Sequence, residues 1–177
     1  DTDLPVEYVV HPFAREGHRF PFYYDATGPV LLLPGSRTAA CERIFPVLLS
    51  GFSRARQVKP ELRAQVIYPS ERIREVLETI LQGFPEMKDG VELIEKSDER
   101  IGVQAALMSS GTMSLAVAMS GIPGAIAYRM NAWSYRLSRL LVKIPFIGIS
   151  NLLLNRPLHP EFIQGAASAE NLSAALL

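Results

Sequence analysis

Cysteine is almost absent from this chain of 177 residues, which contains Cys41 alone. A single cysteine cannot close an internal disulfide or supply a cysteine-rich zinc site, so its default role is core packing. The three histidines, His11, His18 and His159, lack the spacing of a metal-binding pair, and we expect no metal. Neither a GxSxG nor a Walker motif occurs, and no apolar run reaches the roughly 18 residues of a membrane span.

Net charge is also absent, since 18 Lys and Arg balance 18 Asp and Glu, while 48% of the residues are hydrophobic. This composition is typical of one globular domain and excludes a disordered chain. Residues 101–160 nevertheless contain no Asp or Glu. Their basic residues are Arg129, Arg136, Arg139, Lys143 and Arg156. The segment therefore predicts either a surface for an anion, such as a phosphate or lipid head group, or a buried apolar segment poor in all charges. No basic-aromatic pattern indicates nucleic-acid binding.

Short apolar runs alternate with helical patterns along the whole chain. The runs predict strands at 6–10, 30–33, 62–68, 91–94 and 125–128, and a strand or helix-then-strand within 101–108. The patterns predict helices at 38–56, 71–81, 113–120, 131–142 and 169–176. Residues 11–29 and 151–160 are expected to be irregular. This alternation predicts an α/β fold with a doubly wound parallel sheet, Rossmann-like in type.

The first candidate binding motif is Pro34-Gly35-Ser36-Arg37, which lies between a predicted strand and a predicted helix. Backbone N–H groups at a helix start bind anions, a glycine lets a phosphate come close, and an arginine can grip it with two hydrogen bonds. The alternative is a plain helix start with Ser36 as its N-cap.

The second motif, Ser109-Ser110-Gly111-Thr112, has the same setting between an apolar run and a helix. Because the carboxyl ends of parallel strands meet at one sheet edge, we expect it beside the first motif, where ligands of such sheets bind. An ordinary capped helix start remains the alternative here too.

The predicted helix at 131–142 separates an apolar face containing Trp133 from basic residues at Arg136, Arg139 and Lys143. Such a helix can lie on an anionic membrane surface, and these four residues are its candidate membrane-facing residues. The alternative is a helix packed on the sheet with its basic face in solvent.

Taken in order, several segments resemble the carboxyl-terminal half of lipid-A-disaccharide synthases, inverting glycosyltransferases with the GT-B fold. The matching segments, which span nearly the whole chain, are Leu4-Pro5-Val6 to His11-Pro12, Leu31 to Arg37, Ala105 to Thr112, Tyr128-Arg129-Met130, Leu140 to Lys143, Ser150 to Leu153, and Pro160 to Gln164. The resemblance implies one nucleotide-sugar-binding domain over 1–177, with an inter-domain strand and loop at 1–29 and a terminal helix at 165–177.

The family transfers a diacylated glucosamine from UDP to lipid X during lipopolysaccharide synthesis. The resemblance implies that this half holds the UDP-sugar donor and that the half with the acceptor site is missing, so the chain alone should be inactive. It implies Arg37 as the group that stabilises the leaving diphosphate. The implied donor contacts are Pro34, Gly35, Ser36, Ser110, Gly111, Thr112 and Arg129, with Asn151 and Gln164 lining the cleft. No cofactor is implied, and the expected location is the cytoplasm, peripheral on the inner membrane of a Gram-negative bacterium.

Three positions depart from the family pattern, because Ala40, Gln104 and Ala116 stand where carboxylates are usual. This pattern keeps open a degenerate, non-catalytic paralogue that binds a partner or a membrane surface. A different GT-B enzyme, such as a sugar-nucleotide epimerase, is a third possibility. GT-B halves also exchange terminal helices, so we expect the last helix to pack on a neighbouring molecule and make a homo-oligomer.

Overall fold

The computed structural model describes residues 19–131 and 145–177 of the chain. The predicted strand at 6–10 and nearly all of the predicted helix at 131–142 lie outside these residues. In the described part, strands and helices alternate largely as predicted, and no helix there is both long and apolar enough to cross a bilayer.

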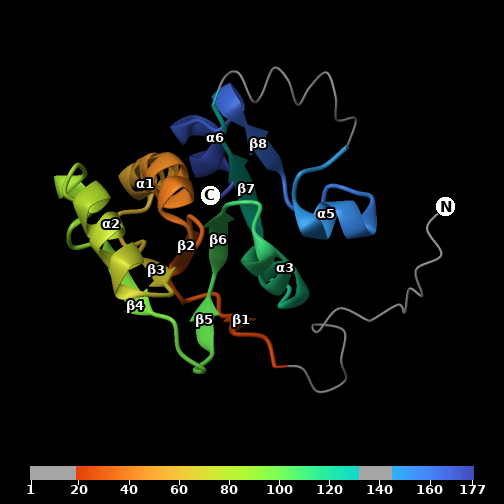
Figure 1. The fold of residues 1–177 in the computed structure, drawn as a ribbon, viewed down its shortest axis with the longest axis horizontal. Helices are drawn as coiled ribbons and strands as arrows, with labels where there is room; N and C mark the ends of the chain where they lie inside the picture. Colours follow the sequence, from red (N-terminus) through yellow and green to blue (C-terminus); the bar gives the residue numbers. More distant parts are fainter. Residues whose placement is uncertain (1–18, 132–144) are drawn as a thin grey trace, which may run out of the picture.

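Six parallel strands form the central sheet (Figure 1). Across the sheet they are β4 (Val91–Glu95), β3 (Ala64–Tyr68), β2 (Val30–Leu33), β6 (Ala105–Met108), β7 (Gly124–Tyr128) and β8 (Glu161–Ile163). The chain builds outward from β2 to β4, returns to β6 beside β2, and then builds outward to β8. This is the doubly wound, Rossmann-like α/β fold predicted from the sequence.

The central strand β2 consists of four apolar residues, and all four are buried. Successive side chains of a strand point to opposite faces of its sheet. Val30 and Leu32 accordingly join one apolar core, while Leu31 and Leu33 join the other. A continuous apolar run is what a strand with two covered faces requires.

Helices cover both faces of the sheet (Figure 1). The first face carries α1 (Thr38–Val58), α2 (Glu71–Leu81) and α6 (Ala169–Ala174), and the second carries α3 (Thr112–Met119), against which α5 (Ile149–Leu154) packs. Two short 3-10 helices, η2 (Pro85–Met87) and η3 (Gln164–Ala166), complete the described elements.

Three short elements correct the predictions from the sequence. Strand β1 (Phe22–Tyr24) lies in a stretch expected to be irregular and pairs with β5 (Ile101–Val103) in a small parallel sheet. Helix α5 overlaps the second stretch expected to be irregular, and β8 was not predicted at all. Each has only three to six residues, so each depends on distant partners rather than on its own sequence pattern.

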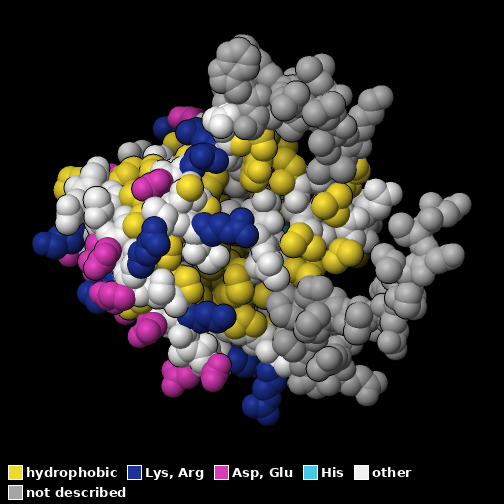
Figure 2. All heavy atoms as spheres, viewed as in Figure 1, with side chains coloured by type: hydrophobic (Ala, Val, Ile, Leu, Met, Phe, Trp, Pro, Cys, Tyr) yellow, Lys and Arg dark blue, Asp and Glu magenta, His cyan; other side chains and the backbone are white. Residues whose placement is uncertain are grey.

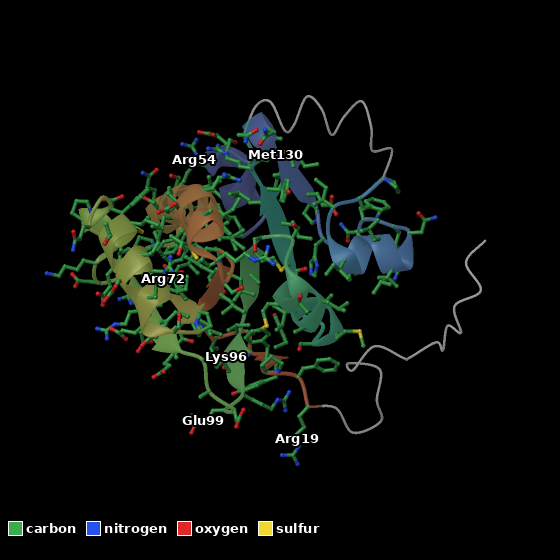
Figure 3. All side chains as sticks on the ribbon, viewed as in Figure 1. Arg19, Arg54, Arg72, Lys96, Glu99 and Met130 are labelled. Atoms are coloured by element: carbon green, nitrogen blue, oxygen red, sulfur yellow. The ribbon has the colours of Figure 1, made fainter. Side chains whose placement is uncertain are left out.

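The last helix, α6, packs on α1 of the same chain. Its Leu172 is fully buried, and Gly51 of α1 leaves the space that this side chain occupies, since a Cβ on Gly51 would lie 2.5 Å from the Leu172 Cβ. Arg54, labelled in Figure 3, forms an ion pair of 3.6 Å with Glu170. The helix thus has a packing site on its own chain, and the homo-oligomer by helix exchange stays a prediction.

Candidate functional site

The two candidate motifs meet at the carboxyl edge of the sheet. Leu33, the last residue of β2, pairs with Met108, the last residue of β6, so the turns that follow them are neighbours. The Ser109 N–H donates to the Leu33 carbonyl at 2.8 Å and ties the two turns together. From this point one connection leads toward β3 and the other toward β7, which makes it the switch point where open α/β sheets bind ligands.

A hollow of about 250 Å³ opens at this switch point. Four of the predicted contact residues line it, namely Gly35 and Ser36 from the first turn and Gly111 and Thr112 from the second. The other predicted turn residues, Pro34, Arg37 and Ser110, lie in the same turns but outside the lining.

Three helix starts at this edge lack a side-chain cap. The N-cap residues are Arg37 for α1, Ser70 for α2 and Gly111 for α3, and none of them accepts a capping hydrogen bond. The alternative interpretation, a plain helix start with Ser36 as the N-cap, is therefore wrong for α1. The first N–H groups of a helix have no acceptor within the helix and form the positive end of its dipole. Without caps, these groups are free to face an anion at the sheet edge.

Gly35 shapes the first turn through its backbone, which has a φ of +122°. A Cβ at this position would lie 3.1 Å from the Ala40 Cβ, so a larger residue would meet both backbone strain and a close contact.

The Gly35 carbonyl accepts a hydrogen bond from the Cys41 thiol at 3.3 Å. Cys41 is fully buried, and this burial raises the pKa of its thiol to about 11. The thiol is therefore neutral at physiological pH, which fits core packing rather than nucleophilic chemistry.

Asn151 lies away from this hollow, in a buried network between α5 and β8. Its amide nitrogen donates to the His159 carbonyl and to the Glu161 carboxylate, both at 2.7 Å, and its amide oxygen accepts from the His159 N–H at 3.0 Å. Glu161 also accepts from the N–H groups of Ile147 and Gly148 at the start of α5. These hydrogen bonds hold the Asn151 side chain inside the fold, away from the hollow, and its place in a cleft stays a prediction.

The side chains of Gln164 and Arg129 also form hydrogen bonds to backbone groups within the fold. The Gln164 side chain bonds to both the N–H and the carbonyl of Met130, at 2.9 Å and 3.1 Å. Arg129 donates to the Ala167 carbonyl at 2.6 Å. These bonds join the segments that follow β7 and β8. Trp133, Arg136, Arg139 and Lys143 lie outside the described residues.

The structure separates the three positions that depart from the family pattern. Gln104 precedes β6 at the amino edge and donates to the Gly28 carbonyl at 2.6 Å, so it lies across the sheet from the two turns. Ala116 lies on the buried side of α3 and is fully buried in the core. Ala40 lies beside Gly35 of the candidate site. Gln104 at least therefore lies apart from the site that the two turns form.

A larger hollow, of about 660 Å³, lies at the amino edge among Gly28, Lys59, Arg63 and Glu92. Although this hollow is the larger of the two, we do not favour it as the ligand site, because the helix starts and their positive dipole ends lie at the opposite edge. Across the described ranges, no three His, Cys, Asp or Glu side chains gather as a metal site would require.

Lys96 lines the carboxyl-edge hollow, and the sequence reasoning missed it. It follows β4 directly, so its position after a predicted strand was the signal that could have found it.

The family model and the relatives found to be similar to this chain share one description. A family model described as lipid-A-disaccharide synthetase matches residues 1–177. The lipid-A-disaccharide synthase of Pseudomonas aeruginosa strain LESB58 is 34% identical over 184 residues, which cover 98% of this chain and 48% of the relative. The synthase of Anaeromyxobacter sp. strain K is 31% identical over 183 residues, covering 98% of this chain and 47% of the relative. The chain thus spans about half the length of the curated relatives that it matches. Because the family model covers the chain from end to end, the chain belongs to the lipid-A-disaccharide synthetase family, glycosyltransferases of lipid A biosynthesis.

Proposed function

We propose that this chain is the carboxyl-terminal, donor-binding half of a lipid-A-disaccharide synthase and holds the UDP-linked diacylglucosamine. The observation that carries the proposal is the meeting of two glycine-containing turns and uncapped helix starts around one hollow at the switch point of the sheet. Backbone N–H groups in this arrangement suit the diphosphate of a nucleotide sugar.

In the proposed reaction, a hydroxyl of lipid X attacks the anomeric carbon of the donor sugar as the bond to the UDP oxygen breaks. Negative charge then grows on the departing diphosphate. N–H groups at the starts of α1 and α3 would stabilise that charge, with the Arg37 guanidinium at the N-cap of α1. The base that accepts the hydroxyl proton and the lipid acceptor site would come from the other half of the enzyme.

The proposal predicts that the chain alone does not transfer sugar, because by this proposal it carries only the donor half. Its basic segment would lie toward the cytoplasmic face of the inner membrane, where the lipid substrates are. Incubation of the chain with the UDP-linked donor and lipid X should yield no disaccharide, whereas the donor should still bind.

Donor binding can be tested by titrating UDP into the isotopically labelled chain and following the backbone amide signals. The signals of Gly35, Ser36, Gly111 and Thr112 should shift, while those of Thr27 and Gly28 at the amino edge should not. Absence of any shift at millimolar UDP, from a chain that is folded by circular dichroism, would refute donor binding.

A non-catalytic paralogue is the second candidate. The observations that favour it are Ala116, which is buried in the core, and Ala40, which brings no carboxylate to the site. This candidate predicts salt-sensitive sedimentation with anionic liposomes that is lost in the double variant Arg136→Glu/Arg139→Glu, together with no UDP binding. Sedimentation that is unchanged in the double variant would count against it.

A further inference from the structure

We propose that Lys96 is a phosphate-binding residue of the candidate donor site and contacts the diphosphate of the nucleotide sugar. This inference rests on the proposed function, which it extends by naming the cation that faces the hollow. Lys96, labelled in Figure 3, directly follows β4 on the segment that leads to β5.

The backbone holds Lys96 at the carboxyl edge of the sheet. Tyr68 and Glu95, the last residues of β3 and β4, form a register pair, and the Lys96 N–H donates to the Tyr68 carbonyl at 2.9 Å. The ladder therefore extends one residue beyond the end of β4. Because β3 lies between β4 and β2, Lys96 lines the hollow from across the end of β3, where Ile67 and Pro69 also line it. The flexible four-carbon stem of a lysine suits such a reach.

The lining of the hollow favours an anion. Lys96 is the one charged residue among the described residues of the lining, which otherwise supply glycine, hydroxyl and apolar groups. No carboxylate among those residues would repel a diphosphate. Arg37, the first choice from the sequence, is exposed and outside the lining.

The Lys96 ammonium is available to a ligand. The ion pairs found within the described ranges are Arg54 with Glu170, and Arg74 with Glu71 and with Glu78, so none of them engages Lys96. The residue is exposed, which limits the affinity that it can add, since charges in water are screened. On the face drawn in Figure 2, most acidic side chains lie along the lower left, while basic side chains lie both among them and nearer the centre, beside apolar ones.

The test compares Lys96→Met, which removes the charge and keeps the length, with Lys59→Met at the opposite edge, also exposed in the native chain. Isothermal titration with UDP and with inorganic pyrophosphate should show binding that is about three- to tenfold weaker in Lys96→Met. Lys59→Met should match the native chain, and Lys96→Arg should retain most of the affinity. Binding by Lys96→Met should also depend less on salt concentration.

The outcomes separate this inference from the proposed function. If the native chain binds UDP and Lys96→Met binds it equally well, Lys96 is only a solvated surface residue and the inference fails alone. If the native chain binds neither UDP nor pyrophosphate at millimolar concentration, both the proposed function and this inference are refuted. Equal weakening in Lys59→Met would indicate a general effect of net charge and would also overturn the role of Lys96.

Discussion

At the residue scale, the turn from β2 into α1 depends on glycine at position 35. Its φ of +122° lies in a region that residues with a Cβ rarely adopt. We expect Gly35→Ala to lower the free energy of unfolding by about 1–3 kcal/mol, measured by urea denaturation. UDP binding should weaken as well, because the turn carries the proposed phosphate contacts.

Gly165 provides the matched control for this strain. Its φ is not positive, and a Cβ there would meet nothing within 4 Å. Gly165→Ala should therefore change the free energy of unfolding by less than about 0.5 kcal/mol. An equal loss in both variants would contradict the argument from the backbone of Gly35.

Cys41 makes a prediction about pH at the same scale. Burial raises the pKa of its thiol from the ordinary 9.0 to about 11. Between these values the unfolded chain releases a proton that the folded chain retains, so folding stability should fall as pH rises from about 9 to about 11. Below pH 9 both states hold the proton and the thiol contributes no pH dependence.

Urea denaturation at pH 8 and pH 10.5 checks this expectation. The native chain and the Cys41→Ala variant share all other titrating groups. The difference between their losses of folding stability therefore isolates the contribution of the thiol. The variant should lose less stability on going to pH 10.5. Equal losses in the two proteins would show that the thiol titrates normally in the folded state.

At the scale of elements, the six residues of α5 hold together through Glu161 of β8. The Glu161 carboxylate accepts from Ile147 N–H at 2.8 Å, from Gly148 N–H at 2.9 Å, and from the Asn151 amide at 2.7 Å. A helix this short does not form alone, and bonds from N–H groups to a carboxylate are strong. The carboxylate therefore couples the last strand of the sheet to a helix that precedes it in the chain.

Glu161→Gln should lower the free energy of unfolding by about 1–3 kcal/mol, because one amide nitrogen replaces an acceptor. Hydrogen exchange should speed up at Leu152, whose N–H donates to the Gly148 carbonyl. Glu75→Gln, on the exposed side of α2, is the control and should leave both measurements unchanged. Unchanged exchange at Leu152 in Glu161→Gln would refute the coupling.

At the scale of the whole molecule, the terminal helix closes the core over α1. Leu172 is fully buried in this core, whereas Leu177 is 49% exposed. We expect Leu172→Ala to cost about 2–5 kcal/mol of unfolding free energy and Leu177→Ala to cost almost nothing, both measured by urea denaturation. The cost should not depend on protein concentration, because the helix packs on its own chain. A midpoint that rises with protein concentration would instead indicate helix exchange between molecules.

The central sheet and its long helices could be predicted because their signals are local. Apolar runs such as that of β2 mark strands with two buried faces, and the period of apolar residues in α1 and α2 marks helices. Strand β1, helix α5 and strand β8 could not be predicted, since β5, Glu161 and β7 stabilise them from elsewhere in the chain. Local pattern carries no information about such partners.

By itself, the sequence determined the alternation of strands and helices, the two glycine-containing turns and their placement on a common edge, because parallel strands end on the same side of a sheet. The tertiary structure alone decided which side chains face the hollow. Strand order brings Lys96 from β4 to the hollow beside β2, leaves Arg37 outside its lining and buries Asn151 in a hydrogen-bond network. These outcomes depend on contacts between residues far apart in the chain, which the local spacing of residues in the sequence does not specify.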